Sequence, residues 1–551
     1  MIDNSVRNNT QNMISSGKTG VACWIVHFRT HSDLFPGPVL EHLMPYIEPR
    51  AELYSNARHP PPSCHKGTRT RTRKRLWDWF VGVEQNVGSR PESVSGSNPN
   101  SDAYLYLGWK LGKQRDKGRG GKQQASPSLF DDVRCDLVMK WLRGSAGTGK
   151  SAVAQTFAEE CSQQTPGRLG AVFFFSRING FNDHTKVIPT LAYQLAVNCF
   201  PYKLALTEQL AHDPQLLNKA PPTLFRKLIV DPFLKLQDEK RQSIQAPLLV
   251  LLDGLDECHG ESNQCELIEM IAETARLYST TLPIRWLIVS RPEEHLKYAF
   301  VDVQLECGVE ELLIDGQCRE DVRCVLHNGF AAIKKKYRNR IPPGWPPMDE
   351  FKVVEGSVDG LFVFTSTILK DIGRPDHGNP ALRLTTVVSF LKHVQEAGTT
   401  NPLEALDKFY TRILNDTSEA DFSTTWRILA NIILIPDDRG LLKPAQVLSN
   451  FLHIDQNTFY GALRKLHSVI DIPEPEDADK SPLCFFHASF QDFLVDPNRS
   501  GVYHIARTKA IAEVIKSAFF WLEFHSVHFH SAQGASLHGL PVNFLTSSLQ
   551  G

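Results

Sequence analysis

The stretch VMKWLRGSAGTGKSAVAQTFAEEC, residues 138–161, joins a short apolar run, a glycine-rich octapeptide and a helical pattern in direct succession. The octapeptide GSAGTGKS fits the pattern G-x-x-x-x-G-K-[ST] without a mismatch. Its glycines allow backbone N–H groups to turn toward phosphate oxygens, and the following helix directs the positive end of its dipole at the same anion. We therefore expect it to bind the phosphates of a nucleotide. The residues of this predicted phosphate site are Gly144, Ser145, Ala146, Gly147, Thr148, Gly149, Lys150 and Ser151.

Two side chains of the octapeptide and one distant carboxylate have specific expected roles. Lys150 places a positive charge near the β- and γ-phosphates, and Ser151 offers its hydroxyl to Mg²⁺. About 100 residues farther on, the run LLVLLD at 248–253 ends in an aspartate. Ligands of parallel α/β sheets bind at the carboxyl ends of the strands. We therefore expect Ser151 and Asp253 to hold a Mg²⁺ ion.

Three further residues are predicted to be catalytic. Asp256 and Glu257 follow directly in the segment GLDE, where a carboxylate can orient an attacking water near the γ-phosphate. Arg291 comes just after the apolar run IRWLIVS at 284–290, which we expect to lie beside the strand of Asp253. A guanidinium at this place can reach the γ-phosphate. For Arg291, an ordinary exposed loop arginine is the alternative interpretation.

Apolar runs alternate with helical patterns around this site. Each run is apolar throughout, which is typical of parallel strands that are covered on both faces. The sequence therefore predicts a doubly wound α/β domain of the P-loop NTPase type. The predicted strands are 138–142, 170–176, 247–253 and 284–290, and the predicted helices between them are 151–161, 185–200 and 265–277.

Helical patterns dominate beyond about residue 320. They are followed by a strand-like piece at 483–486 and an apolar helix at 490–495, an order that suits a winged-helix module. The predicted domains are a P-loop NTPase domain at 134–310, a helical domain at 311–420, a winged-helix-like domain at 421–500, and a C-terminal helix and tail at 501–551.

The charge balance differs along the 551 residues. The whole chain carries 60 Lys and Arg against 61 Asp and Glu, whereas residues 1–135 carry 19 against 12. The neutral total argues against a dedicated nucleic-acid-binding protein. We expect residues 1–130 to be a poorly ordered basic leader with a linker or insertion at 88–128, which is rich in Gly, Ser, Pro, Asn and Lys. The basic stretches 66–75 and 110–122 are predicted to be solvated linker, with binding to nucleic acid or an anionic surface as the alternative.

The 11 cysteines are scattered and form no C-x-x-C pair, which argues against a disulfide framework or a zinc ribbon. The first residues, MIDNSVRNNTQNM, lack the apolar core of a signal peptide, and no apolar run reaches about 18 residues. We therefore expect an intracellular, cytoplasmic protein without a membrane span.

Five stretches together resemble a NACHT-type P-loop NTPase of the STAND class of signalling ATPases. The resemblance is nearest to fungal proteins built around a nephrocystin-type P-loop module, and it covers about residues 134–500. The segment DGLDE is its most specific feature, and an outlying likeness lies at 66–80, where the family shows a G-T-R turn before a tryptophan-containing helix. The stretches are WLRGSAGTGKSAVAQTFAE, LGAVFFFSR, IPTLAYQLA, LLVLLDGLDEC and IRWLIVSRPEEHL.

The resemblance implies two further site features. The segment FFHASFQDFL at 485–494 is similar to the part of NACHT proteins whose histidine touches the β-phosphate of bound ADP, so His487 would make that contact. A buried core histidine is the alternative. The segment GLF at 360–362 aligns with a position where plant-type relatives have G-L-P, and the missing proline leaves an adenine contact there open.

The function that the resemblance implies is a nucleotide-dependent signalling switch. It would bind ATP or ADP with Mg²⁺, with GTP not excluded, and hydrolyse slowly, so that nucleotide state controls domain opening and assembly. Its partners would be the nucleotide and either further copies of itself or signalling proteins, with no specific nucleic acid. Two alternatives remain: a nucleotide-binding scaffold that does not hydrolyse, and a continuously cycling P-loop ATPase.

Overall fold

The computed structural model describes residues 38–58, 61–82 and 138–531, apart from 178, 214, 239–246, 280, 304–306, 313–315, 375–377, 399–400 and 435–443. The chain divides into two compact units. The first consists of Met1–Glu48 and Thr185–Ser243, and the second of Pro49–His184 and Ile244–Gly551. The predicted insertion at 88–128 and the basic stretch at 110–122 lie outside the described residues.

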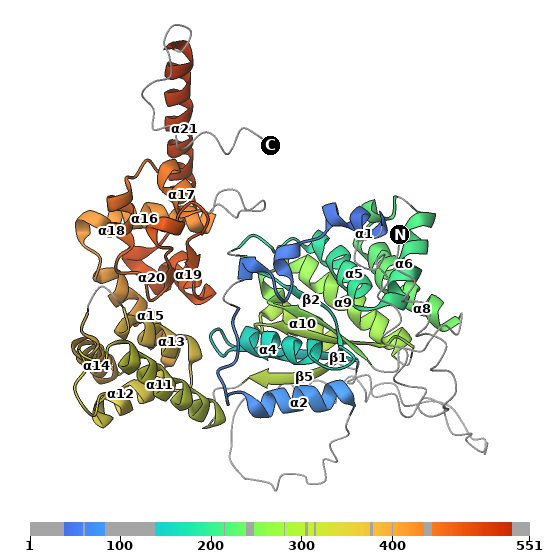
Figure 1. Cartoon of the computed structure of the whole chain (residues 1–551), viewed down its shortest axis with the longest axis horizontal. Helices are drawn as coiled ribbons and strands as arrows, with labels where there is room; N and C mark the ends of the chain where they lie inside the picture. Colours follow the sequence, from blue (N-terminus) through green and yellow to red (C-terminus); the bar gives the residue numbers. More distant parts are fainter. Residues whose placement is uncertain are drawn as a thin grey trace, which may run out of the picture. The chain divides into compact units, whose positions relative to one another are not determined.

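The second unit contains a parallel sheet of five strands, in the order β2-β3-β4-β1-β5 (Figure 1). The predicted α/β class and its parallel sheet are confirmed. The sequence did not predict the strand at Cys307–Leu312, because its residues, CGVEEL, include a glycine and two glutamates and so form no continuous apolar run. The strands are β1 (Met139–Gly144), β2 (Leu169–Phe174), β3 (Leu248–Asp253), β4 (Ile284–Ser290) and β5 (Cys307–Leu312).

Helices cover both faces of this sheet, which explains why its inner strands are mainly apolar and largely buried. On one face, α2 (Thr70–Val81) and α4 (Lys150–Ser162) pack against alternate strand residues such as Leu142. On the other, Trp141 stacks on Phe300 of α10 (Glu294–Asp302), with ring centroids 4.0 Å apart. Helix α9 (Glu261–Tyr278) also contacts β1 and α10.

Helix α2 corrects the prediction for the N-terminal region. The stretch 66–75 was expected to be solvated linker within a poorly ordered leader, and this prediction is wrong for the described residues 61–82. Leu76 and Phe80 are fully buried in the sheet's core, and Arg69 is 5% exposed. Leu76, Trp79 and Phe80 share one helical face, but the arginines and lysines before them conceal this apolar spacing in the sequence.

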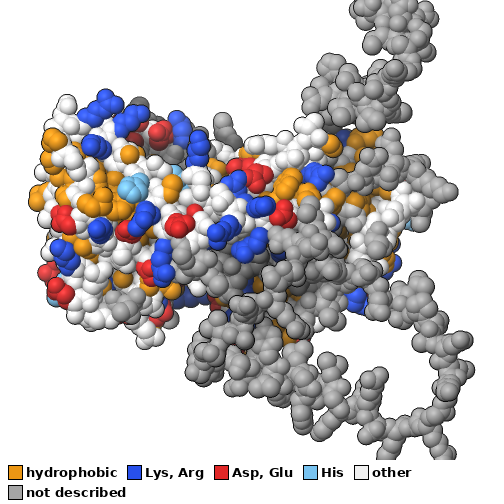
Figure 2. All heavy atoms as spheres, turned by 90° about the horizontal axis from the view of Figure 1, so that it is seen from below, with side chains coloured by type: hydrophobic (Ala, Val, Ile, Leu, Met, Phe, Trp, Pro, Cys, Tyr) orange, Lys and Arg blue, Asp and Glu red, His pale blue; other side chains and the backbone are white. Residues whose placement is uncertain are grey.

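Basic side chains are dispersed on the face that Figure 2 presents. Among the described residues of this face, Lys and Arg lie between acidic and apolar side chains and form no single basic patch (Figure 2). A nucleic-acid-binding protein typically gathers its basic residues on one face or along one helix. The view therefore adds nothing in favour of the nucleic-acid alternative.

The first compact unit is helical. The predicted helix at 185–200 is present as α5, but its residues group with Met1–Glu48 and not with the sheet, which differs from a single domain at 134–310. The Glu48 N–H donates to Thr190 Oγ1 at 2.8 Å, and Lys186 Nζ donates to the Pro45 carbonyl at 2.9 Å. The helices are α1 (Pro38–Leu43), α5 (Val187–Asn198), α6 (Phe200–His212), α7 (Pro221–Leu224) and α8 (Asp231–Asp238), with a π-helical turn at Phe225–Val230.

The C-terminal part of the second unit is also mainly helical and has one continuous apolar core, from Val322 to Ala510. The two predicted domains at 311–420 and 421–500 therefore share a core. A two-stranded antiparallel sheet pairs β6 (Ile470–Asp471) with β7 (Cys484–Phe485). The helices are α11 (Gly316–Lys336), α12 (Met348–Val358), α13 (Phe362–Ile372), α14 (Pro380–Glu396), α15 (Pro402–Asn415), α16 (Glu419–Leu434), α17 (Ala445–Phe451), α18 (Gln456–Leu463), α19 (Ala488–Val495), α20 (Pro497–Ser500) and α21 (Arg507–Ser531).

Candidate functional site

The turn between β1 and α4, residues 144–151, is the centre of the candidate site, and we refer to it as the glycine loop. Gly147 and Gly149 have φ angles of +76° and +88°, which side chains with a Cβ rarely adopt. A Cβ on Gly147 would also lie 2.3 Å from Cγ1 of Val363, so this position has no room for one. Thr148 Oγ1 donates to the Ser145 carbonyl at 2.9 Å and closes the turn.

Lys150 lies at the start of α4 and is folded back over the loop. Its Nζ donates to the carbonyls of Gly144 at 2.8 Å and Ser145 at 3.0 Å. Burial lowers the pKa of Lys150 to about 8, although the carboxylates of Asp256 and Asp253 oppose this shift. An anion bound in the loop would favour the charged ammonium, because an opposite charge offsets the cost of burial.

Asp253 ends β3 beside the start of α4, with 4% of its surface exposed. The Ser151 hydroxyl hydrogen-bonds to its carboxylate, and burial raises the pKa of Asp253 to about 6. Among the described residues, no group hydrogen-bonds to Asp253 Oδ1. A buried carboxylate oxygen without a partner, next to a hydroxyl, is a donor set of the kind that Mg²⁺ accepts. The predicted metal residues, Ser151 and Asp253, therefore lie together and fit such an ion.

Glu257 lies one turn beyond β3, in the short helix Leu255–Glu257. Its Oε2 accepts the backbone N–H of Arg177 at 3.0 Å. Burial and the neighbouring Asp256 carboxylate raise the pKa of Glu257 to about 7. A carboxylate with a pKa near neutrality suits general-base chemistry, because it can take up a proton and release it again near pH 7.

Asp256 and Arg291 form an ion pair, and a third residue joins them. Arg291 donates its backbone N–H to Asp256 Oδ1 at 2.9 Å, and its Nε lies 3.4 Å from Asp256 Oδ2. Its Nη1 lies 2.7 Å from Oδ2 of Asp492 on α19. The predicted catalytic arginine is therefore placed between two carboxylates. Asp492 carried no signal in the sequence, because it lies 201 positions from Arg291.

His487 is the N-cap of α19. Its Nδ1 accepts the backbone N–H of Ser489 at 3.0 Å, so the ring proton belongs on Nε2 in the neutral form. Burial, together with the positive charges of Arg291 and Lys150, lowers the pKa of His487 to about 4. The imidazole therefore lies within electrostatic range of Lys150 in the glycine loop and of Arg291. The phosphate contact that the resemblance implies stays a prediction.

Arg69 is a site residue that sequence reasoning missed. It lies before α2 in the left-handed region, with φ of 55°. Its Nη2 donates to the carbonyl of Thr148 in the glycine loop at 2.6 Å and approaches Cys318 Sγ at 3.1 Å. Its backbone N–H donates to Asp321 Oδ2 at 2.9 Å. The G-T-R turn in the outlying stretch was a signal for it, but the surrounding basic residues favoured the linker interpretation.

Arg58 is a second missed residue. Its guanidinium carbon lies 3.4 Å from the centre of the Phe174 ring, and Phe174 pairs in register with Asp253 on the neighbouring strand. Burial lowers the pKa of Arg58 to about 10, while Asp253 opposes the shift. A cation therefore lies near the Asp253 carboxylate, whose Oδ1 has no hydrogen-bond partner among the described residues.

The segment 360–363 lies directly against the glycine loop. The N–H of Val363 donates to the Gly147 carbonyl at 3.4 Å, and a Cβ on Gly149 would lie 3.8 Å from the ring of Phe362. The GLF segment that the sequence aligned with G-L-P thus contacts the predicted phosphate site. The side chain of Phe362 also lies 4.9 Å from the Arg69 guanidinium, measured from ring centre to Cζ.

A model of the nephrocystin 3, N-terminal family matches residues 131–291. The match runs from just before β1 to Arg291, so it contains the glycine loop and the segment with Asp253, Asp256 and Glu257. It ends before α11 and does not include His487. No curated protein matches the chain. Within the described residues, no helix has both the length and the apolar character to cross a membrane.

Replacing Arg69 by Ala should destabilise the fold by about 3 kcal/mol, because it removes a charged donor to Thr148 and to Cys318 from a buried position. Arg71→Ala is the matched control, since Arg71 is exposed in the same basic stretch. Urea denaturation of both variants measures the difference. Equal midpoints for the two variants would mean that Arg69 does not hold α2 and the glycine loop together.

Proposed function

We propose that this chain is a nucleotide-dependent switch that binds ATP or ADP with Mg²⁺ and hydrolyses the triphosphate slowly. One observation carries the proposal. The glycine loop combines the Lys150 ammonium with the unpartnered Oδ1 of Asp253 nearby. Residues from distant parts of the second unit either contact this loop or lie within electrostatic range of it. These residues are Arg69, Val363 and His487.

The chain's own groups would hold the nucleotide as follows. The backbone N–H groups of residues 145–150 and the Lys150 ammonium would bind the phosphates, and Ser151 with Asp253 would bind Mg²⁺. Bound Mg²⁺ would neutralise phosphate charge and so favour attack at the γ-phosphorus. Glu257 would orient the attacking water and take its proton.

The coupling between nucleotide and conformation would involve Arg291 and His487. Arg291 already pairs with Asp256, which follows β3, and with Asp492 on α19. A γ-phosphate near Arg291 would compete with Asp492 for the same guanidinium, whereas the His487 Nε2–H can donate to a diphosphate. The triphosphate would therefore weaken the contact with α19, and the diphosphate would keep it.

We also propose that the chain is a NACHT-type STAND protein. The order α17, α18, β6, β7 and α19 suits the winged-helix-like part of a NACHT-type STAND protein, which would follow the P-loop NTPase domain. In that class, opening leads to assembly, so the expected partner is a second copy or a signalling protein inside the cell. The family match to residues 131–291 supports the N-terminal part of this assignment.

The experiment is to identify the nucleotide in purified protein and to measure particle mass by light scattering with ADP and with a non-hydrolysable ATP analogue. We expect bound ADP, a small species with ADP and a larger one with the analogue. The same measurements with GDP and a non-hydrolysable GTP analogue determine whether the chain prefers adenine or guanine nucleotides. Protein that contains no nucleotide, binds none and keeps one mass in all conditions would contradict the proposal.

A further inference from the structure

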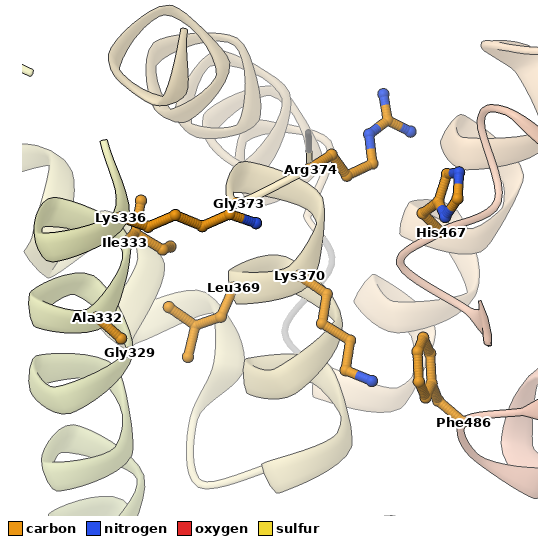
Figure 3. Close-up of a pocket in the computed structure, with 10 residues that line it drawn as sticks. All are labelled: Gly329, Ala332, Ile333, Lys336, Leu369, Lys370, Gly373, Arg374, His467 and Phe486. Carbon is orange, nitrogen blue, oxygen red and sulfur yellow. The ribbon is translucent and has the colours of Figure 1, made fainter. Parts of the chain in front are cut away.

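A pocket of about 400 Å³ lies between α11, α13 and the segment around β7 (Figure 3). Its apolar lining includes Ile333 of α11, Leu369 of α13 and Phe486. The two helices approach closely here, since a Cβ on Gly329 would lie 2.4 Å from Cδ1 of Leu369. The volume is within the range of about 300–1,000 Å³ that is usual for small-molecule sites.

Cationic side chains complete the lining. Lys336, Lys370 and Arg374 line the pocket, and none of its described lining residues is Asp or Glu. In Figure 3, the Lys370 side chain extends from α13 toward Phe486, and its Nζ lies 2.6 Å from the centre of that ring. Burial lowers the pKa of Lys370 to about 8, even though Asp471 opposes the shift. The nearby acidic charge therefore does not compensate the cost of burying this ammonium.

Arg374 gives the pocket a fixed side. Its side chain is 1% exposed, and its Nη1 donates to the Lys465 carbonyl at 2.7 Å. This hydrogen bond joins the end of α13 to the segment before β6, on either side of the pocket. The pocket is therefore bounded by the buried Arg374 on one side and by Phe486, which is 41% exposed, on another.

We propose that this pocket binds a small anionic amphiphile, a molecule with one carboxylate or phosphate head and a compact apolar body. The head would pair with Lys370 and Lys336, and the body would contact Ile333, Leu369 and Phe486. A neutral apolar ligand would give the buried Lys370 ammonium no counter-charge, and an inorganic anion would leave the apolar side chains in contact with water. Both kinds of contact are needed to match the lining.

The pocket is also connected to the candidate nucleotide site. Phe486 directly precedes His487, the N-cap of α19, and Asp492 of the same helix lies 2.7 Å from Nη1 of Arg291. The Phe486 N–H donates to the Val469 carbonyl at 3.0 Å. Phe486 and His487 therefore lie in a segment that hydrogen bonds hold in place on both sides, because His487 caps α19. A ligand that packs on Phe486 would therefore change nucleotide affinity. This coupling, but not the binding itself, rests on the proposed function.

The binding experiment is calorimetric titration of the full chain with octanoate, octyl phosphate, 1-octanol and inorganic phosphate. We expect one site for the two anionic amphiphiles and affinities lower by about tenfold or more for the alcohol and for phosphate. Equal affinity for octanoate and 1-octanol, or for octyl phosphate and inorganic phosphate, would overturn the proposal. Sedimentation with phosphatidylglycerol vesicles tests a membrane source of the same headgroup. The proposal would also be overturned if the protein sedimented with the vesicles only when Lys370 is present and yet did not bind octanoate in solution.

The variants are Lys370→Gln and Phe486→Ala, with Lys334→Gln on the exposed side of α11 as the matched control. We expect each pocket variant to lose about tenfold or more in octanoate affinity and the control to keep it. Phe486 is partly exposed, so its variant remains informative if Lys370→Gln fails to fold. The same titration in Lys150→Ala separates the proposals, because the pocket should still bind octanoate in a protein that binds no nucleotide. Unchanged affinity in folded pocket variants would reject the site.

Discussion

Lys150→Ala is expected to weaken the binding of ATP and ADP by about 100-fold or more, because the variant removes the charged donor at the centre of the glycine loop. The ammonium already lies over the loop, 2.8 Å and 3.0 Å from two of its carbonyl oxygens. Burial lowers its pKa to about 8 and so disfavours the charged form, and a bound phosphate would offset this cost. Calorimetric titration with each nucleotide measures the loss.

Thermal denaturation provides the folding control for this prediction. A ligand at 100 times its dissociation constant stabilises the folded state by about 2.7 kcal/mol, so ADP should raise the melting temperature of the wild type and not that of Lys150→Ala. Without nucleotide, the two proteins should melt at similar temperatures, since the lost hydrogen bonds are offset by relief of a buried charge. Lys297→Ala, an exposed lysine on α10, should behave as wild type. Undiminished nucleotide binding in folded Lys150→Ala would reject the proposed function.

The glycine loop and its strands could be predicted because their signals are local. The apolar runs of β1, β3 and β4, and the glycines required by positive φ angles, lie within a few residues of one another in sequence. The same holds for Asp253 at the end of its strand. Their mutual placement follows from the rule that ligands bind at the carboxyl ends of parallel strands.

The residues that enclose the loop could not be predicted, because their pairings depend on long-range packing. Arg69 contacts Thr148 across 79 residues, and Asp492 reaches Arg291 across 201. A basic stretch has the same composition whether it is solvated or folded, and only the burial of Leu76 and Phe80 distinguishes the two cases. His487 was proposed from a family resemblance, since a histidine between aromatic residues is by itself more typical of a core.

Glu257→Gln is expected to reduce the rate of hydrolysis by about 100-fold while nucleotide binding is retained, because an amide cannot take the proton of the attacking water. The substitution is conservative in structure, since the Gln oxygen can still accept the Arg177 N–H that lies 3.0 Å from Oε2. The pKa of about 7 adds a second readout. The wild-type rate should rise with pH, by about tenfold per unit below pH 7, and level off above it, because the deprotonated carboxylate is the active form.

The pH profile distinguishes a catalytic role of Glu257 from a structural one. Loss of an N–H acceptor would lower the rate equally at all pH values, whereas loss of the base should also abolish the rise toward pH 7. Glu261→Gln, at the exposed start of α9, is the control and should keep the full profile. If Glu257→Gln changes neither hydrolysis nor particle mass, the chain is a nucleotide-binding scaffold and not a switch. If the wild type turns over faster than a few times per minute, which is ordinary for enzymes, a cycling ATPase explains it better. Slow turnover that depends on Glu257, together with a mass that follows the nucleotide, would leave the switch as the explanation that accounts for both.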